Sequence, residues 1–316
     1  MKRILISAIL TLLVAIALLL ATGGGCRKSG GTLTSGEDGA VALLPETPPE
    51  PQEITLTMMT YNAGAFRKSL GDLGHYSYGE VATVIKSVGP VIVALNETDW
   101  GGVRSPGEKQ AKKLAARLGT GWSAKFFSAG YSWYGNAIVW DKHKFSPHYV
   151  YDRMELEKTD GYEVRSMGAI DFNSFVFCVT HLDQVSETDR LNAVDKISSW
   201  AKENYGNSGK PVFLVGDMNA EPAGATVAKF RENWIQLSGE DLTYPADAPR
   251  KCIDYIFVFK NGADSRVELL SSGIVTEDDV PEAVTASDHR PVWATVRIHR
   301  DNVWLFTQIT PMAPSN

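Results

Sequence analysis

Short apolar runs alternate with polar stretches from residue 54 to about residue 298, and this alternation is the main structural signal in the chain. Several of the runs are rich in β-branched and aromatic residues and are bounded by turn residues, which is typical of β-strands. The predicted strands are residues 54–60, 91–95, 136–140, 163–171, 174–180, 211–215, 252–259 and 292–298.

Amphipathic stretches between these strands predict helices. One apolar face at helical spacing comprises Ala111, Leu114, Ala115 and Leu118. A second comprises Leu191, Val194, Ile197 and Ala201. Ser186 precedes the second face and Asp189 follows three residues later, which is typical of a helix start. Strands and helices in this number predict an α/β (α+β) fold, a four-layer sandwich of two packed, mostly antiparallel β-sheets flanked by helices.

Residues 1–26 have the pattern of an export signal. Lys2 and Arg3 form a basic start, and residues 4–21 form an almost unbroken apolar run. Cys26 follows three glycines, which resembles the processing site of a bacterial lipoprotein, where the cysteine is acylated. That signal usually has Leu where Gly23 stands, and cleavage near Gly23 or an uncleaved anchor are the alternatives. We therefore expect an exported protein, either a cell-envelope lipoprotein held at the membrane by its N-terminus or a secreted protein.

The other segments differ from one another in composition. Residues 27–53 are rich in Gly, Ser, Thr, Pro and Glu and lack any apolar period, so we expect a flexible linker. Residues 54–299 form the predicted domain. Residues 300–316 form a C-terminal tail, in which Trp304, Leu305 and Phe306 either add an edge strand or trail.

The charge balance excludes one class of function. The 31 Lys and Arg against 37 Asp and Glu give a net charge of -6. Proteins that coat nucleic acid usually carry a net positive charge or a basic stripe, so this chain does not belong to that class. A phosphate substrate is still compatible with the charge, because a bound divalent cation supplies positive charge locally.

Nearly every distinctive polar residue lies at the end of a predicted strand or just before one. The set comprises Asn62, Glu97, Asn136, His181, Asp217, Asn219, Asp288 and His289. Side chains at strand ends can converge at one rim of a sandwich. An Asp-His pair alone is more often a loop that holds a satisfied histidine, but repetition at several strand ends favours a site.

Seven short segments contain these residues in order along the domain. They are MTYN (59–62), ALNE (94–97), GNAI (135–138), THLD (180–183), GDMN (216–219), IDYI (253–256) and SDHRPV (287–292). The ordered set resembles the endonuclease/exonuclease/phosphatase superfamily, whose members include pancreatic-type deoxyribonuclease, bacterial sphingomyelinases and inositol polyphosphate 5-phosphatases. The resemblance implies a divalent-metal-dependent phosphoesterase that uses water as the nucleophile without a covalent intermediate.

The resemblance also assigns metal-binding residues. Glu97 corresponds to the family's metal-binding glutamate, Asn62 would assist through its amide oxygen, and Asp288 would face the same site. Oxygen ligands of this kind suit Mg²⁺, with Mn²⁺ as the alternative. The family usually has Gln before the glutamate, whereas Asn96 stands here, which leaves open how Glu97 is supported.

Catalytic residues follow from the same resemblance. His289 would be the base or electrostatic partner, with Asp254 holding its other ring nitrogen. Asp217 would orient the attacking water, and Asn219 would project toward the same phosphate. Asp254 as a cap of the turn before Tyr255 and a plain turn at residues 217–219 are the alternatives.

Phosphate-binding residues complete the implied site. His181, Asn136 and Asn219 would hydrogen-bond phosphoryl oxygens and stabilise the charge that develops there. Arg165 resembles an arginine that the nuclease members carry near the site, and a surface arginine on an edge strand is the alternative.

The expected function is hydrolysis of a phosphodiester or phosphomonoester, with nucleic acid as the first substrate hypothesis. A phospholipid or sugar-phosphate headgroup is the alternative within the enzyme class. A catalytically silent surface binding module on the same fold is the alternative outside it. The aromatic loops 65–78 and 131–134 are expected to select the substrate. The sequence indicates no protein partner.

Overall fold

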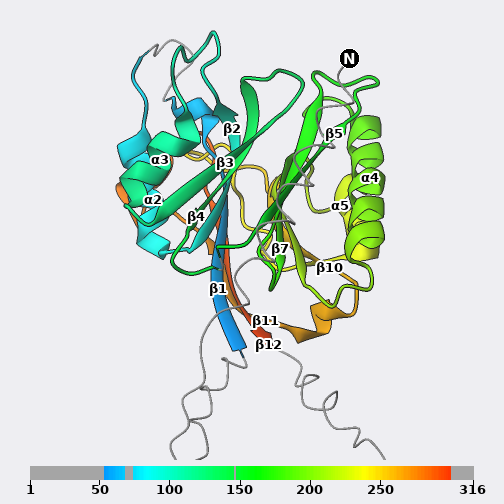
Figure 1. Cartoon of the computed structure of the whole chain (residues 1–316). Helices are drawn as coiled ribbons and strands as arrows, with labels where there is room; N and C mark the ends of the chain where they lie inside the picture. The colour runs from blue at the N-terminus through cyan, green and yellow to red at the C-terminus, as the bar shows by residue number, and fades with distance from the viewer. Residues whose placement is uncertain (1–52, 68–73, 146, 300–316) are drawn as a thin grey trace, which may run out of the picture. The chain divides into compact units, whose positions relative to one another are not determined.

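Two six-stranded β-sheets pack face to face in the structure, a computed structural model that describes residues 53–67, 74–145 and 147–299 (Figure 1). The first sheet has the order β11-β12-β1-β2-β4-β3 and the second the order β5-β6-β7-β8-β10-β9. The first consists of β1 (Glu53–Asn62), β2 (Ile92–Asp99), β3 (Trp122–Ser128), β4 (Tyr134–Asp141), β11 (Val267–Ile274) and β12 (Val292–His299). The second consists of β5 (Val150–Leu156), β6 (Arg165–Asp171), β7 (Val176–His181), β8 (Val212–Asp217), β9 (Trp234–Gln236) and β10 (Asp254–Phe259).

Each sheet has one parallel pair near its centre, and its other neighbouring strands are antiparallel. β1 is parallel to β2, and β7 is parallel to β8. Parallel neighbours end at the same edge of a sheet, so each sheet places two strand ends together there. In this register Asn62 lies beside Asn96, and His181 lies beside Asp217.

Two helices cover the outer face of each sheet (Figure 1). α2 (Tyr78–Val88) and α3 (Gln110–Leu118) pack on the first sheet, and α4 (Glu187–Tyr205) and α5 (Ala225–Asn233) pack on the second. Short 3-10 helices occur at Gly64–Phe66, Ala263–Arg266 and Pro281–Val284. The predicted four-layer sandwich of mostly antiparallel sheets is confirmed.

Apolar side chains fill the space between the sheets and the space under each helix pair. β8 illustrates both contacts, because Phe213 and Val215 face the other sheet while Val212 and Leu214 face the helices. Side chains on a strand alternate between its faces, so a strand that is buried on both faces has a continuous apolar run. Such runs are what the sequence pattern detects.

All eight predicted strands are present, with shifted ends, and the pattern missed the four edge strands β3, β5, β9 and β11. Most residues of β5 and half of those of β11 are exposed, and most of β3 is half-buried. An edge strand that keeps little apolar surface away from water has no continuous apolar run. The sequence therefore identified the buried centre of each sheet.

The two predicted helices are confirmed as α3 and α4. Ala111, Leu114, Ala115 and Leu118 are all buried under α3. Ser186 is the N-cap of α4, and its Oγ accepts a hydrogen bond from the Asp189 N–H at 3.0 Å. The pattern did not predict α2 and α5.

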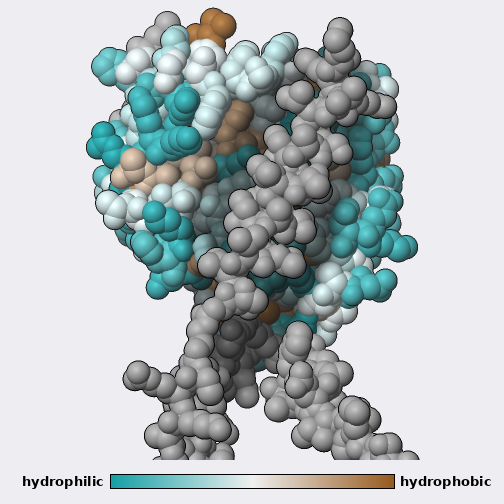
Figure 2. Space-filling model, viewed as in Figure 1, coloured by the Kyte–Doolittle hydropathy of each residue, from teal (hydrophilic) through white to brown (hydrophobic). Residues whose placement is uncertain are grey.

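The predicted terminal segments lie outside the described residues, and these include Cys26 and the run from Trp304 to Phe306. β1 begins at Glu53, one residue before the predicted domain boundary, and β12 ends at His299. Within the described part of the chain, no helix is long and apolar enough to cross a membrane. On the face in Figure 2, hydrophilic residues spread over both halves of the domain, and hydrophobic residues form small patches.

Gly168 of β6 packs directly on the ring of Phe127 from the other sheet. A Cβ at this position would lie 2.2 Å from the ring, whereas a Cβ on Gly79 in α2 would meet nothing within 4 Å. We predict that Gly168→Ala lowers the free energy of unfolding by about 1–3 kcal/mol, because the sheets have to separate locally. The same change at Gly79 is expected to raise it by about 0.5–1 kcal/mol through better helix propensity. Urea unfolding of both variants measures this, and equal effects would contradict the packing account.

Candidate active site

Three polar residues lie side by side at the end of the second sheet. His181 of β7 pairs in register with Asp217 of β8, which pairs with Asp254 of β10. Each occupies an inward-facing position, because the residues two and four places along the same strand belong to the core between the sheets. The strand pattern that buries apolar residues therefore also directs these three side chains into the space between the sheets.

The first sheet places three amides opposite this row by the same alternation. Asn62 ends β1, Asn96 lies in β2 and Asn136 lies in β4, and all three are buried. Asn62 Nδ2 donates to Asp217 Oδ2 at 3.1 Å, so a direct hydrogen bond joins the two sheets inside the site. The strand ends thus bring the predicted residues together.

Asn96 contacts both sheets through a fully buried amide. Its Nδ2 donates to Asn136 Oδ1 at 2.9 Å and to the Thr180 carbonyl at 2.8 Å. Its Oδ1 accepts from the Asp217 N–H at 3.0 Å. Asn96, which stands where the family usually has Gln, therefore supports Asp217 and Asn136. None of these hydrogen bonds goes to Glu97.

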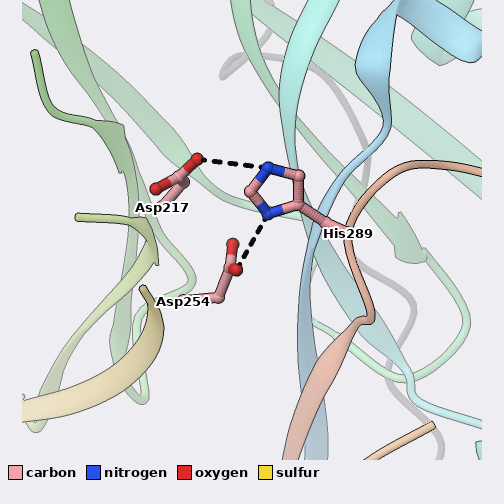
Figure 3. A group of neighbouring side chains, drawn as sticks. All are labelled: Asp217, Asp254 and His289. Atoms are coloured by element: carbon pink, nitrogen blue, oxygen red, sulfur yellow. Dashed lines mark hydrogen bonds and ion pairs between the residues drawn. The ribbon is translucent and has the colours of Figure 1, made fainter. Parts of the chain in front are cut away.

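His289 lies between two carboxylates (Figure 3). Its Nδ1 is 2.9 Å from Asp254 Oδ2, and its Nε2 is 3.7 Å from Asp217 Oδ2. Thr243 Oγ1 donates to the same Asp254 oxygen at 2.6 Å, which fixes that carboxylate. The sequence assigned Asp254 to His289 rather than to a turn cap, and the structure brings the two into contact.

These contacts change the pKa values of both partners. Burial lowers the pKa of His289, but the Asp254 charge and hydrogen bond outweigh it and raise the pKa to about 10. Burial and the Asp254 charge raise the pKa of Asp217 to about 7. At neutral pH the histidine is therefore a cation, and Asp217 is the group poised to exchange a proton.

His181 is neutral and its tautomer is set by Arg165. Burial, Arg165 and His289 hold the His181 pKa well below its ordinary value. Arg165 Nη1 lies 3.1 Å from His181 Nδ1, and since a guanidinium only donates, Nδ1 is the acceptor. Nε2 therefore carries the hydrogen, 3.5 Å from Asp217 Oδ2. Asn219 Nδ2 lies 3.0 Å from Nε2 and donates to the Leu182 carbonyl at 2.9 Å.

Two site residues have left-handed backbone conformations. Glu97 has φ 54° and Asn219 has φ 47°. Glu97 sits in an irregularity of β2 between Leu95 and Thr98 and lines the cavity, although the next residue after inward-facing Asn96 would face outward in a regular strand. The bulge is what turns Glu97 toward the site. At Asn219, the N–H donates to Asp217 Oδ1 at 2.9 Å and orients that carboxylate.

Oxygen donors for a metal lie on one side of this group. The Glu97 carboxylate forms no hydrogen bond or ion pair within the described part of the chain. Asp288 is exposed, and within the described residues its side chain accepts one hydrogen bond, from Ser287 Oγ to Oδ1 at 3.4 Å. Asn62 Oδ1 accepts from the Gly64 N–H at 3.1 Å, which leaves a lone pair. Two carboxylates that form no ion pair among the described residues, together with an amide oxygen, fit a hard divalent ion.

Asp217, Asp254 and His289 are a second group that can hold a metal ion. Their ligand atoms all lie within 4.8 Å of one another. The hydrogen bond between His289 and Asp254 and the one from Asn62 to Asp217 already occupy several of these atoms. Among the side-chain oxygens and nitrogens of these three residues, Asp254 Oδ1 is the one that is buried without a hydrogen-bond partner.

A cavity of about 570 Å³ opens at this end of the sandwich. It is lined by six of the predicted site residues, namely Glu97, His181, Asp217, Asn219, Asp288 and His289. Asn136 is 2% exposed, and its amide pairs with Asn96 and with the Ser166 carbonyl. Arg165 bonds His181 and forms an ion pair with Glu163 at 2.9 Å. Phosphate contact by Asn136 and Arg165 therefore stays a prediction, while support of the site by both is observed.

Two structural roles near the site were not predicted. Asp183 accepts four backbone N–H groups, from Tyr162, Glu163, Val185 and Ser186, and so joins the loop before β6 to the start of α4. The ring of Tyr244 lies 4.8 Å from the His289 ring. Asp183 continues the inward alternation two residues after His181, which was the available signal. Tyr244 comes from a loop and gave none.

Fold and site together define a class, namely a two-sheet α/β protein with a buried histidine held between two carboxylates at one end. Residues 59–289 match the model of the Endonuclease/Exonuclease/phosphatase family. The match spans more than half of the 316 residues, and the chain belongs to this family, as the motifs indicated. Members of the family are phosphoesterase hydrolases that are generally dependent on divalent metals.

Solved structures of the same fold cover 76–79% of this chain. A family member from Bacteroides vulgatus is 21% identical with a TM-score of 0.61, covering 78% of this chain and 100% of its own. The mannosyl-6-phosphatase of Bacteroides thetaiotaomicron is 18% identical with a TM-score of 0.59, covering 76% and 99%. The human Nocturnin catalytic domain is 17% identical with a TM-score of 0.56, covering 79% and 99%. Identities this low show the fold alone. No curated protein sequence matches this chain.

Removing the Asn96 amide would leave three buried groups without partners. We predict that Asn96→Ala lowers the free energy of unfolding by about 2–4 kcal/mol, because the Asp217 N–H, the Thr180 carbonyl and Asn136 each lose a hydrogen bond. Asn204→Ala on the exposed face of α4 is the matched control, expected to stay within about 0.5 kcal/mol. Urea unfolding measures both, and a mild effect at Asn96 would show that Asn96 does not hold the strand ends.

Asp183 predicts a pH-dependent stability. Burial raises its pKa, but the four backbone donors outweigh this and hold it below the ordinary value of 3.8. Its stabilisation is therefore complete above pH 3.8 and is lost as the pH falls through the lower folded pKa. Asp183→Asn should lower Tm by several degrees at pH 7, and the difference from the native protein should shrink near pH 3. Exposed Asp247→Asn is the control. A difference that does not change with pH would contradict the assignment.

Proposed function

We propose that this protein is an exported, divalent-metal-dependent phosphoesterase in which water attacks phosphorus directly. The observation that carries the proposal is the row of His181, Asp217 and Asp254 set against His289 at the rim of the cavity. A silent binding module has no physical need for this arrangement, because burying unused charged groups costs free energy. Among the described residues, neither Ser nor Cys lines this cavity. No such side chain is therefore placed to act as a covalent nucleophile.

Asp217 is the residue that orients and deprotonates the water. Asn62 Nδ2 and the Asn219 N–H hold its two oxygens, so the carboxylate has one orientation in the cavity. A raised pKa of about 7 makes it a stronger base than an ordinary carboxylate, while it is still substantially ionised at neutral pH.

His289 and His181 act on the phosphoryl group in different charge states. His289, kept protonated by Asp254, places a positive charge next to the site where negative charge develops. His181, kept neutral, offers the hydrogen on Nε2 to a phosphoryl oxygen. Both groups are fixed before substrate arrives, which is the condition for effective electrostatic stabilisation.

Glu97, Asp288 and Asn62 would hold the metal ion. Their oxygen donors suit Mg²⁺, with Mn²⁺ as an alternative. When bound, the ion would act as a Lewis acid and neutralise charge on a phosphoryl oxygen. This placement leaves intact the hydrogen bond between His289 and Asp254 and the ion pair between His289 and Asp217.

The cavity wall supports a small phosphate ester rather than the long nucleic acid first considered. The carboxylates of Glu97, Glu187, Glu221 and Asp288 line it beside the cations Arg190 and Lys251, whereas a duplex backbone needs a continuous basic surface. Among structures of this fold, one is named a mannosyl-6-phosphatase and one a 2',3'-cyclic phosphatase. A phosphorylated small molecule is therefore the substrate class we propose.

Export and attachment to the cell envelope rest on residues 1–26 and Cys26, with residues 27–52 as the tether. Glu53 and Asn62 lie at opposite ends of the ten-residue strand β1. The first described residue therefore lies at the end of β1 that is about 30 Å from the site.

Turnover tests the proposal directly. We predict hydrolysis of p-nitrophenyl phosphate or bis-p-nitrophenyl phosphate with Mg²⁺ or Mn²⁺, abolished by EDTA. Asp217→Asn and His289→Gln should each lower kcat by about 10²–10⁴-fold while the far-UV spectrum and Tm stay near native. His299→Gln, at the far end of β12, is the matched control and should keep full activity. Absence of metal-dependent turnover in the native protein would favour the silent module.

A further inference from the structure

Most of the cavity wall belongs to the second sheet and to the segments that connect its strands. Beyond the proposed catalytic residues, its wall is formed by the loop after β7 with the first turn of α4, the loop after β8 and the loop before β10. The polar wall residues are Gln184, Glu187, Arg190, Glu221, Tyr244 and Lys251. None of the described residues of loops 65–78 and 131–134, which were expected to select the substrate, lines this cavity.

The aromatic loop of the first sheet is engaged in packing instead. A Cβ on Gly102 would lie 2.3 Å from the Trp133 ring, so this ring fills the space above Gly102. Tyr131 stacks on Trp133 with ring centres 5.5 Å apart. The expectation that residues 131–134 choose the substrate therefore has no support from the cavity.

Balanced charge is the main chemical feature of the wall. Glu187 and Glu221 supply two carboxylates, while Arg190 and Lys251 supply two cations. A second phosphate on the substrate would meet both carboxylates. A quaternary ammonium would need several aromatic faces, and Tyr244 is the one aromatic residue in the described lining. A hydroxyl group can donate to a carboxylate and accept from a cation, so several hydroxyls satisfy this wall.

Arg190 is held in place before any ligand binds. Its Nε donates to Thr226 Oγ1 at 3.4 Å, and its Nη1 donates to the Asp183 carbonyl at 2.9 Å. No hydrogen bond from Nη2 is present within the described residues, so this donor is available in the cavity. Lys251 belongs to a tight loop whose backbone pairs with Tyr244 on both sides. The Arg190 guanidinium, fixed in this way, loses little entropy when it binds a ligand.

We propose that the leaving group of the substrate is a polyhydroxyl ring, a monosaccharide or cyclitol phosphate, whose hydroxyls are bound by Glu187, Arg190 and Glu221. This assignment rests on the phosphoesterase function proposed above and names the residues that determine its specificity. The volume of about 570 Å³ lies in the range of small-molecule sites and is enough for one sugar ring with its phosphate. The rest of the site then contacts the phosphate, and the second-sheet loops contact the ring.

Two variants and one control test the assignment by binding and by kinetics. Glu187→Gln and Glu221→Gln remove the charge of each carboxylate at nearly constant size. Glu203→Gln, an exposed residue farther along α4, is the control. The probes are glucose 6-phosphate, mannose 6-phosphate and myo-inositol 1-phosphate, with phenyl phosphate as the probe that lacks hydroxyls.

Calorimetry of the full chain in Ca²⁺ measures binding without requiring turnover. We expect at least one polyhydroxyl probe to bind more tightly than phenyl phosphate. Each Glu→Gln variant should reduce this preference by about tenfold, the usual loss for one hydrogen bond to a charged group, while Glu203→Gln leaves it unchanged. Where turnover is measurable, the ratio of KM for that probe to KM for p-nitrophenyl phosphate should rise in the same variants.

The possible outcomes separate the two proposals. Equal binding of phenyl phosphate and of all three polyhydroxyl probes overturns the assignment of the leaving group. The assignment is also overturned if the preference for a polyhydroxyl probe over phenyl phosphate is lost in Tyr131→Ala but kept in Glu187→Gln. Recognition of the ring would then lie at the first sheet. If the native protein shows no metal-dependent turnover but Glu187→Gln loses the preference for a polyhydroxyl probe, the binding assignment is supported. That result contradicts only the proposed catalysis.

Discussion

The buried amide of Asn96 is the interaction on which the site depends. At the rim of the sandwich, inward-facing positions change from apolar to polar, and buried polar groups have to find partners between the two sheets. Asn96 bonds Asn136, the Thr180 carbonyl and the Asp217 N–H, and so connects β4, β7 and β8 to β2. The distances among the catalytic side chains follow from strand ends that this amide holds together.

The two buried histidines of the site, His289 and His181, differ in charge. Asp254 keeps His289 protonated, whereas Arg165 takes the Nδ1 lone pair of His181 and helps to keep that ring neutral. Two histidines of similar burial thus carry different charges because each has a different partner. Glu97 and Asp288 are carboxylates of the cavity wall that have no cation of their own, which makes them the site for one in this account.

Sequence reasoning was most successful where burial is greatest. The central strands and the row of His181, Asp217 and Asp254 share one cause, since alternation along a buried strand places the apolar residues and the polar residues of the candidate site on the same face. Edge strands such as β5 were missed because their residues are exposed. The bulge that turns Glu97 and the loop that places Tyr244 depend on backbone conformation and tertiary contact, which periodicity does not encode.

Location of a bound metal tests the central claim most directly. Crystals of the protein soaked in Mn²⁺ would show the ion in an anomalous difference map. The account predicts one peak within about 2.2 Å of carboxylate oxygens of Glu97 and Asp288, with the hydrogen bond between His289 and Asp254 preserved. A peak bonded to Asp217, Asp254 and His289 would contradict it, because these residues would then be ligands and not the groups that move protons and stabilise charge.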